Sequence, residues 1–187
     1  MKFPELCLLK TEHLVLRKIT EADIPAYYRL FGSEQVARWM LWEPHTRMEQ
    51  SAAAVEKVLW RYQAGRCYRW GITRKGEDVL IGIIELLRFD ELSGDCSFAY
   101  MIHPDHWGQG YGTEALEAAF RFAFEKMETD TITADHFADN PASGAVMRKA
   151  GMEFVQMLPG RYEKNGSLHD AVQYRITKEM WQEKTRC

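Results

Sequence analysis

Hydrophobic and polar positions change their spacing several times along the chain, and these changes predict the order of its elements. Alternating apolar and polar residues predict a strand at residues 13–19, and further strands are predicted at residues 67–74, 79–88, 94–102, 131–137, 152–158 and 169–177. Apolar residues on one helical face predict a helix at residues 113–126, and further helices are predicted at residues 20–31, 34–40, 46–63 and 141–150, with a short one from 178. The order is therefore one strand, two or three helices, three antiparallel strands, and then helix, strand, helix and two strands.

Capping signals support several of these helix boundaries. The runs Thr20–Asp23 and Thr46–Glu49 are typical of capping boxes, in which side chains satisfy the first free N–H groups of a helix. Asn140 is a favoured N-cap residue, and Pro141 suits the first helical position because it has no N–H to satisfy. Gly151 ends the same helix.

The candidate chemistry begins with three glycines at alternate positions, Gly108, Gly110 and Gly112, between a predicted strand and the helix expected from Thr113. Glycines leave a loop free of side chains, so its N–H groups can turn towards a ligand. The helix adds its own unsatisfied N–H groups and the positive end of its dipole. Strand, loop and helix in this order predict an anion site, most naturally for a phosphate or pyrophosphate.

Other phosphate-binding loops fit this run less well. A dinucleotide fold requires G-x-G-x-x-G, and the third glycine would fall at Thr113. A Walker loop ends in Gly-Lys-Ser/Thr, which the chain does not contain. A tight turn that binds nothing is the remaining alternative.

Two segments together carry a resemblance to a known family. The run Trp107–Ala115 reads Trp-Gly-Gln-Gly-Tyr-Gly-Thr-Glu-Ala, and the run Asn140–Met152 follows after one further strand. Together they resemble the GCN5-related N-acetyltransferases, and the similarity extends over about residues 12–180. Trp107 departs from the usual Gln or Arg, but this form of the loop resembles the branch that includes the ribosomal-protein N-terminal acetyltransferases.

The resemblance implies an α+β fold with a mixed, mostly antiparallel, seven-stranded sheet and flanking helices, in one domain over residues 1–187. It also implies acetyl-coenzyme A (acetyl-CoA) as the acyl donor. In this family the strands before and after the glycine loop and its helix diverge, and the pantetheine arm lies between them. The implied cofactor-binding residues are Met101, Ile102, Gly108, Gln109, Gly110, Tyr111, Gly112, Thr113, Asn140 and Ser143.

Two residues are the candidate catalytic groups. Ser143 stands where relatives carry a serine proposed to protonate the leaving sulfur, although a serine in the first turn of a helix can also bond locally. Glu85 lies in an otherwise apolar strand, where a carboxylate is unusual unless it borders a cleft. It is the candidate general base, and the alternative is a position on a solvent face. Tyr162, His136 or a chain of water molecules are further candidates for the base.

The acceptor expected from the resemblance is a primary amine, and we favour the N-terminal amine of a protein or peptide. Small amines such as aminoglycosides or polyamines stay open, because similar enzymes acetylate them. A non-catalytic acyl-CoA-binding module is a third hypothesis. It is favoured by Val155, which stands where the ribosomal-protein branch often has a glutamate.

The composition of the chain excludes several other classes of protein. The chain has 187 residues, 46% of them hydrophobic, and a formal net charge of −3. It contains no run of Lys and Arg, which argues against nucleic-acid binding. Pro4 and Glu5 interrupt any apolar run at the start, so neither a signal peptide nor a membrane span is expected. Four cysteines without a Cys-x-x-Cys pair are typical of reduced thiols in the cytoplasm, and they are Cys7, Cys67, Cys96 and Cys187.

Two other side-chain groups are weaker candidates for a site. His103, Asp105 and His106 lack a further spaced ligand, so no metal is expected. Six aromatic residues could line an acceptor pocket, although such residues more often belong to the core or to a dimer surface. They are Trp39, Trp42, Trp60, Tyr62, Tyr68 and Trp70. A homodimer stays open on this ground.

Overall fold

The computed structural model describes residues 2–65 and 67–186. Its strands are β1 (Leu9–Lys10), β2 (Leu14–Arg17), β3 (Tyr68–Arg74), β4 (Leu80–Asp90), β5 (Asp95–Ile102), β6 (Thr131–Phe137), β7 (Glu153–Lys164) and β8 (Ser167–Thr177). Its α-helices are α1 (Ile24–Phe31), α2 (Glu34–Ala37), α3 (Met48–Gln63), α4 (Tyr111–Phe122), α5 (Pro141–Lys149) and α6 (Lys178–Arg186). Short helical turns η1 (Glu21–Asp23), η2 (Pro104–His106) and η3 (Ala123–Met127) complete the elements.

All the strands form one sheet in the order β1-β2-β3-β4-β5-β6-β8-β7. Among the strands of the described residues, only β5 and β6 run parallel, and every other neighbouring pair is antiparallel. The predicted α+β fold with a mixed, mostly antiparallel sheet is therefore confirmed. The sheet has eight strands where seven were expected. The additional strand is β1, which is only two residues long and pairs with β2, too short to show an alternating pattern.

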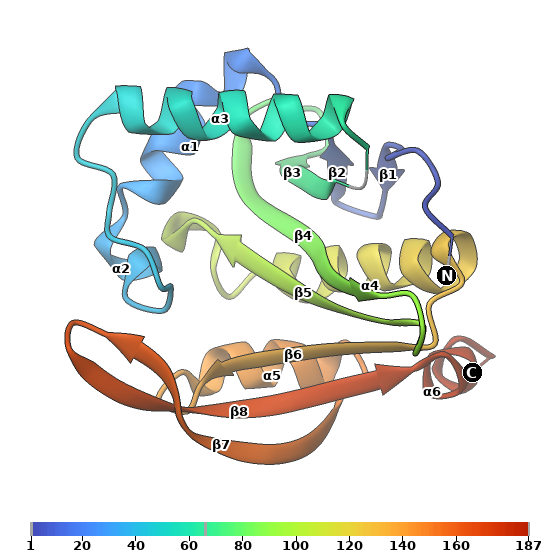
Figure 1. The fold of residues 1–187 in the computed structure, drawn as a ribbon. Coiled ribbons are helices and arrows are strands. Elements are labelled where there is room, and N and C mark those ends of the chain that lie inside the picture. The colour runs from blue at the N-terminus through green and yellow to red at the C-terminus, as the bar shows by residue number, and fades with distance from the viewer. Residues whose placement is uncertain (1, 66, 187) are drawn as a thin grey trace.

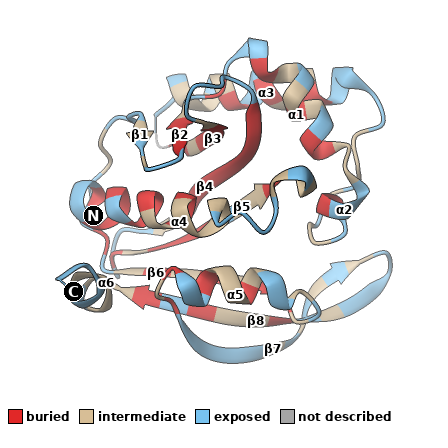
Figure 2. Cartoon of the chain, turned by 180° about the vertical axis from the view of Figure 1, so that it is seen from behind, coloured by how far each residue is buried: buried red, intermediate tan, exposed pale blue. Residues whose placement is uncertain are grey.

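Helices cover the two faces of the sheet in different places (Figure 1). We call one face the α1/α3 face, because α1 and α3 cover it over β2 to β5, where a core cluster that includes Tyr27, Val55 and Ile83 is buried. The opposite face is the α4/α5 face, where a larger cluster packs beneath α4 and α5 around Trp70 and Phe120 (Figure 2). α1 and α3 do not extend over β6, β8 and β7 (Figure 1).

The last two strands form a hairpin that is longer than the sequence pattern predicted. β7 reaches Lys164 instead of residue 158, and β8 begins at Ser167 instead of residue 169. The tip is Asn165-Gly166, with φ angles of +52° and +73°. Positive φ at both positions is the geometry of a type I′ turn, for which Asn-Gly is the strongest sequence signal. The hairpin could therefore have been predicted from that dipeptide.

Some observed helix boundaries differ from the predicted ones by a few residues. α4 begins at Tyr111, two residues before the predicted Thr113, because Gly110 forms its N-cap with φ +83°. The expected capping box at Thr20–Asp23 is confirmed, with the Thr20 N–H donating to the Asp23 carboxylate at 2.8 Å. The second helix ends at Ala37, three residues before the predicted Met40.

The expectations on membrane spans, cysteines and metal sites can be compared with the described residues. Over residues 2–65 and 67–186, no helix is long and apolar enough to cross a membrane. The thiols of Cys7, Cys67 and Cys96 are free, and Cys187 lies outside the described residues. Within the same ranges, no three His, Cys, Asp or Glu side chains form a group that could hold a metal ion.

Candidate active site

The sheet opens between its two parallel strands. β5 and β6 pair only from Asp95–Thr131 to Ser97–Thr133. Beyond that point β5 continues against β4 as far as Ile102, and β6 continues against β8 as far as Phe137. The two strands therefore diverge and leave a gap in the middle of the sheet (Figure 1). This is the strand geometry that the resemblance implied.

The pairing register determines which backbone groups of β5 face this gap. The N–H of His103 donates to the Ile81 carbonyl at 2.8 Å, so residues 81 and 103 form a hydrogen-bonded pair. Such pairs recur every two residues, which turns the backbone groups of Met101 towards Ile83 of β4 and those of Ile102 towards the gap. The Ile102 carbonyl accepts a hydrogen bond from the indole of Trp107 at 2.7 Å. The register therefore offers the N–H of Ile102, rather than Met101, to a ligand in the gap.

The glycine loop presents open backbone at one end of the gap. Gly108 and Gly110 have φ angles of +74° and +83°, and no atom would lie within 4 Å of a Cβ at either position. Glu114 is the first residue of α4 whose N–H bonds back, to the Gly110 carbonyl at 3.1 Å. The N–H groups of Tyr111, Gly112 and Thr113 precede the first helical bond and are available to an anion. The loop thus fits a phosphate or pyrophosphate.

A tyrosine links the loop helix to α5. The third glycine, Gly112, allows close packing, because a Cβ there would lie 3.3 Å from the ring of Tyr100. The Tyr100 hydroxyl lies 3.5 Å from Ser143 Oγ. Burial raises the pKa of Tyr100, which keeps its phenol protonated at neutral pH. Asn140 caps α5 by accepting from the Ser143 N–H at 3.3 Å, as its cap role predicted.

Tyr100 is a candidate proton donor that the sequence analysis missed. Its only signal was the alternation of β5, which places residues 98, 100 and 102 on the α4/α5 face. That alternation does not show that α5 brings Ser143 to the same point.

On the α1/α3 face, one row of side chains crosses the gap. The row runs from Arg69 of β3 through Glu85 of β4 to Ala99 of β5, as the strand registers show. Because Ser97 pairs with Thr133, the residue of β6 level with Ala99 is Asp135. Ala99 is exposed although it lies on a central strand. The α1/α3 face is therefore open at the point where the strands diverge, with a carboxylate on each side.

Glu85 is the more deeply buried of these carboxylates. Its side chain is 8% exposed, and its Oε2 accepts from Arg69 Nε at 2.9 Å. Arg61 Nη2 of α3 lies 2.8 Å from Oε1 as an ion pair, but no hydrogen bond to Oε1 forms within the described residues. Accepting a proton would require Glu85 to loosen one of these ion pairs. Its role as the base stays a prediction.

Asp135, on the other side of the gap, was missed by the sequence analysis. Its side chain is 16% exposed, and Oδ2 accepts from Arg161 Nε at 3.1 Å. Burial, and then the charge of Asp135, raise the pKa of Tyr162, so the phenol stays protonated at neutral pH. Asp135 comes from an ordinary alternating strand, and only the parallel register with β5 brings it to the gap.

The last candidate base points away from this opening. His136 lies on the α4/α5 face, where its Nδ1 is 2.7 Å from the Phe137 carbonyl and its ring stacks on Tyr174. Burial lowers its pKa, so the ring is neutral at pH 7. Val155, whose identity favoured a non-catalytic module, lies on β7, and β8 separates that strand from β6.

Comparisons with known proteins identify the family of this chain. The Acetyltransferase (GNAT) domain family matches residues 13–153. The chain belongs to this GCN5-related N-acetyltransferase family.

Relatives span nearly the whole chain. An uncharacterized N-acetyltransferase of Bacillus subtilis, YoaA, is 30% identical over 91% of this chain and 97% of its own length. The ribosomal-protein-serine acetyltransferase of Escherichia coli is 24% identical over 86% of this chain and 88% of its own. The crystal structure of spermidine N-acetyltransferase from Vibrio cholerae in complex with CoA and spermine has a TM-score of 0.78 at 18% identity, covering 90% of this chain and 98% of that one.

In this GNAT protein, contacts between α2 and the β7–β8 hairpin border the gap on the α1/α3 face. Lys164, at the hairpin tip, donates to the carbonyl of Ala37 and to that of Met40 at 2.6 Å. The ring centroid of Phe137, at the end of β6, lies 6.3 Å from that of Trp39 and 4.5 Å from that of Tyr162. These contacts connect the segment around α2 with the end of β6 and with the hairpin.

The six aromatic candidates lie in different parts of the fold. Trp39 belongs to the border, Trp42 stacks on Phe31, and Trp60 is exposed. Tyr68 and Trp70 are buried in the larger core cluster. The Tyr62 hydroxyl donates to the Arg69 carbonyl at 2.6 Å. The expectation of core positions is therefore met for Tyr68 and Trp70.

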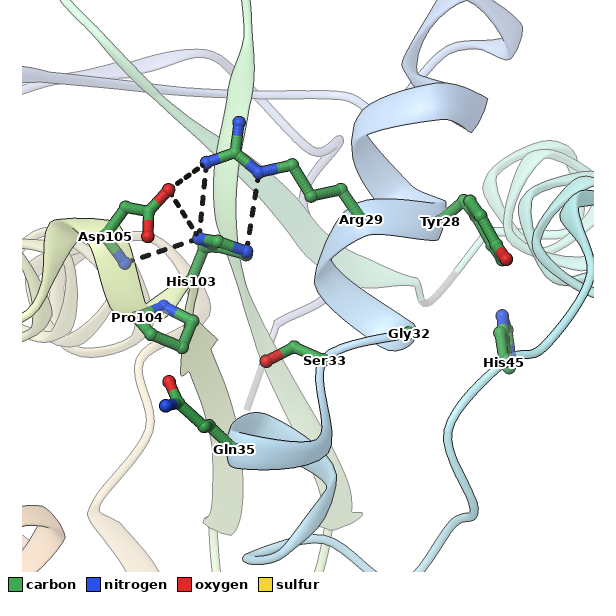
Figure 3. Close-up of a pocket in the computed structure, with 9 residues that line it drawn as sticks. All are labelled: Tyr28, Arg29, Gly32, Ser33, Gln35, His45, His103, Pro104 and Asp105. Atoms are coloured by element: carbon green, nitrogen blue, oxygen red, sulfur yellow. Dashed lines mark hydrogen bonds and ion pairs between the residues drawn. The ribbon is translucent and has the colours of Figure 1, made fainter.

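A separate hollow of about 390 Å³ lies where β5 ends, between η2 and the C-terminal end of α1 (Figure 3). Its polar lining includes Arg29, which donates to the Asp105 carboxylate at 2.7 Å and lies beside the His103 ring. Burial and the charge of Arg29 lower the pKa of His103. The hollow contains neither the glycine loop nor the two carboxylates of the row.

The proton donor can be tested at α5. We expect Ser143→Ala to lower kcat by about 10²-fold, typical of a lost acid, while acetyl-CoA affinity changes little, because the hydroxyl acts as the thiolate leaves. Steady-state kinetics and calorimetry check this, with Tyr100→Phe measured beside it. A change in kcat of less than about twofold, under ~0.5 kcal/mol, would make Ser143 only a helix-start serine. A large loss in Tyr100→Phe alone would assign the proton to the phenol.

Proposed function

We propose that this protein transfers the acetyl group of acetyl-CoA to the N-terminal amine of a protein or peptide. The observation that carries the proposal is the gap between β5 and β6. One end of it has the open N–H groups of the glycine loop, and its α1/α3 face opens at Ala99 between Glu85 and Asp135. The similarity to the ribosomal-protein-serine acetyltransferase supports an N-terminal amine as the acceptor.

The residues that would hold acetyl-CoA follow from this geometry. The N–H groups of the Gly108–Thr113 loop suit the pyrophosphate, and the N–H of Ile102 suits an amide of the pantetheine arm. Gln109 belongs to the glycine loop, and Asn140 is the N-cap of α5. When bound, acetyl-CoA supplies a thioester carbonyl to the acceptor amine.

The chain's own side chains then handle two protons. The amine must be neutral to form the C–N bond, so a base takes its proton; Glu85 is the candidate and Asp135 the second one. As the C–S bond breaks, the sulfur takes a proton, and Ser143 and Tyr100, on the opposite face of the sheet, are the candidate donors. An α-amino group titrates near ~8 and a lysine near ~10.4, so an N-terminal amine needs less help from the base.

A small polyamine is the second candidate acceptor. It is supported by the structural similarity to spermidine N-acetyltransferase. It would be recognised by surplus negative charge around the opening, because polyamines carry several ammonium groups.

A thiol-release assay separates these candidates. We expect CoA release with a peptide that has a free N-terminus at a kcat/KM at least about 10-fold above that with spermidine or an aminoglycoside, or ~1.4 kcal/mol. Mass spectrometry of the product locates the acetyl group, and the same peptide with a blocked N-terminus is the control. Faster release with spermidine would favour the polyamine. Tight acetyl-CoA binding without release for any amine would favour a non-catalytic module.

A further inference from the structure

Arginines outnumber the carboxylates around the opening at Ala99. Glu85 contacts Arg61 and Arg69, and Asp135 contacts Arg161. Three positive and two negative side chains leave this row with a surplus of one positive charge, although the whole chain has a formal net charge of −3. The sign at the opening is therefore opposite to that of the molecule.

Two of these arginines keep donors for a ligand. Arg69 is occupied, because its Nε and Nη2 bond to Glu85 and its Nη1 donates to the Tyr27 hydroxyl at 3.1 Å. Arg161 uses only Nε, and Arg61 only Nη2, among the contacts within the described residues. Their side chains are 44% and 42% exposed. Each guanidinium thus presents free N–H groups to solvent, one on each side of the gap.

The carboxylates in the row also limit what can bind there. Glu85 Oε1 is buried beside Arg61 and receives no hydrogen bond within the described residues, so it can accept one from an acceptor amine only after the Arg61 side chain shifts. A second cationic group on the same acceptor would meet Arg61 or Arg161, and like charges at close range disfavour binding. A carboxylate on the acceptor would instead match the planar donors of a guanidinium.

We infer that the acceptor carries a carboxylate close to its reacting amine, as an N-terminal peptide with an acidic second or third residue does. Arg61 or Arg161 binds this carboxylate, and both arginines select against polyamines. This specificity rests on the proposed transfer to an N-terminal amine, and it assigns Arg61 and Arg161 as residues that determine which amine is used.

The test compares three peptides that are identical except for Asp, Asn or Lys at the second residue. We expect kcat/KM to be about 10-fold higher for the Asp peptide than for the Asn peptide, and lowest for the Lys peptide. The reason is that one good ion pair at a partly exposed site changes affinity by about tenfold. The preference should weaken as salt rises from 0.05 to about 0.5 M. In Arg61→Gln, in Arg161→Gln or in both, the Asp/Asn ratio should fall towards 1, and the variant in which it falls identifies the arginine that binds the carboxylate. The ratio is the readout because a general loss of activity or stability cancels in it.

Arg121→Gln is the matched control, since Arg121 is an exposed arginine on α4, on the opposite side of the sheet. It should keep the Asp/Asn ratio of the unchanged protein. An Asp/Asn ratio near 1 in the unchanged protein would overturn the inference, as would a ratio that survives in both Arg61→Gln and Arg161→Gln. Faster acetylation of the Lys peptide or of spermidine would overturn it in favour of a cationic acceptor. Release of no thiol with any amine would overturn the proposed function, and this specificity with it.

Discussion

Replacing Gly110 with valine should abolish tight binding of acetyl-CoA while the protein stays folded. Gly110 has φ +83°, a region that costs an L-residue roughly 1–2 kcal/mol, and more for a β-branched one. No atom lies within 4 Å of the site of its Cβ, so the new side chain clashes with nothing in the protein itself. It would stand over the free N–H groups at the start of α4. We expect the Kd measured by calorimetry to rise by about 10²-fold, which is ~2.7 kcal/mol.

Gly76→Val is the matched control for backbone strain. Gly76 has φ +80° and also has no atom within 4 Å of its Cβ site, but it lies in the turn between β3 and β4. Both variants should lose similar thermal stability, and only Gly110→Val should lose acetyl-CoA affinity. Equal affinity in the two variants would remove the glycine loop from the cofactor site.

Most of the fold could be predicted because its signals are local. Capping residues marked the starts of helices, as at Thr20–Asp23 and at Asn140, and both caps form in the structure. The alternation of residues 131–137 predicted β6 with its observed bounds. Where the prediction was short, the reason was also local: the Asn165-Gly166 turn extends the last hairpin. β1 was not predicted because a strand of two residues is too short to show a periodic pattern.

The candidate site was only partly predictable, because half of it depends on pairing between distant strands. The glycine loop is contiguous in sequence, so its position was predicted directly. Asp135 and Tyr100 were missed, since nothing in their neighbourhood distinguishes them from other residues of a strand. Asp135 becomes level with Ala99 only through the parallel register of β5 and β6. Tyr100 meets Ser143 only through the packing of α5.

The same reason explains the ambiguity of Glu85. The sequence indicated that a carboxylate in an apolar strand either borders a cleft or faces solvent. The structure places it beside the opening but holds it between Arg61 and Arg69, which come from α3 and β3. Those two ion pairs join residues that are distant in sequence, so no local pattern predicts them. They give the candidate base Glu85 two charged partners, and Asp135 across the gap is a natural comparison.

Substituting the base should cut the rate at neutral pH by roughly 10²-fold, the lower end of general-base effects. For Glu85→Gln we expect this loss in kcat/KM with unchanged acetyl-CoA affinity, and Asp135→Asn tests the other side of the gap. Removing the charge of Glu85 leaves Arg69 without its partner, and breaking a buried pair can cost about 3–5 kcal/mol. Thermal unfolding and calorimetry with acetyl-CoA are therefore measured first, and rates are compared only for variants that fold and bind.

The pH dependence then identifies both the base and the amine. The deficit of a base variant should shrink as pH rises, because more of the acceptor amine is then neutral without assistance. An α-amino acceptor should show this recovery near pH ~8, and a lysine acceptor only near ~10. If Glu85→Gln recovers in this way and Asp135→Asn loses the same factor at every pH, Glu85 is the base and Asp135 positions Arg161. The reverse pattern would transfer the role to Asp135. Two variants whose rates follow the unchanged protein at every pH would exclude both carboxylates and leave the proton to solvent.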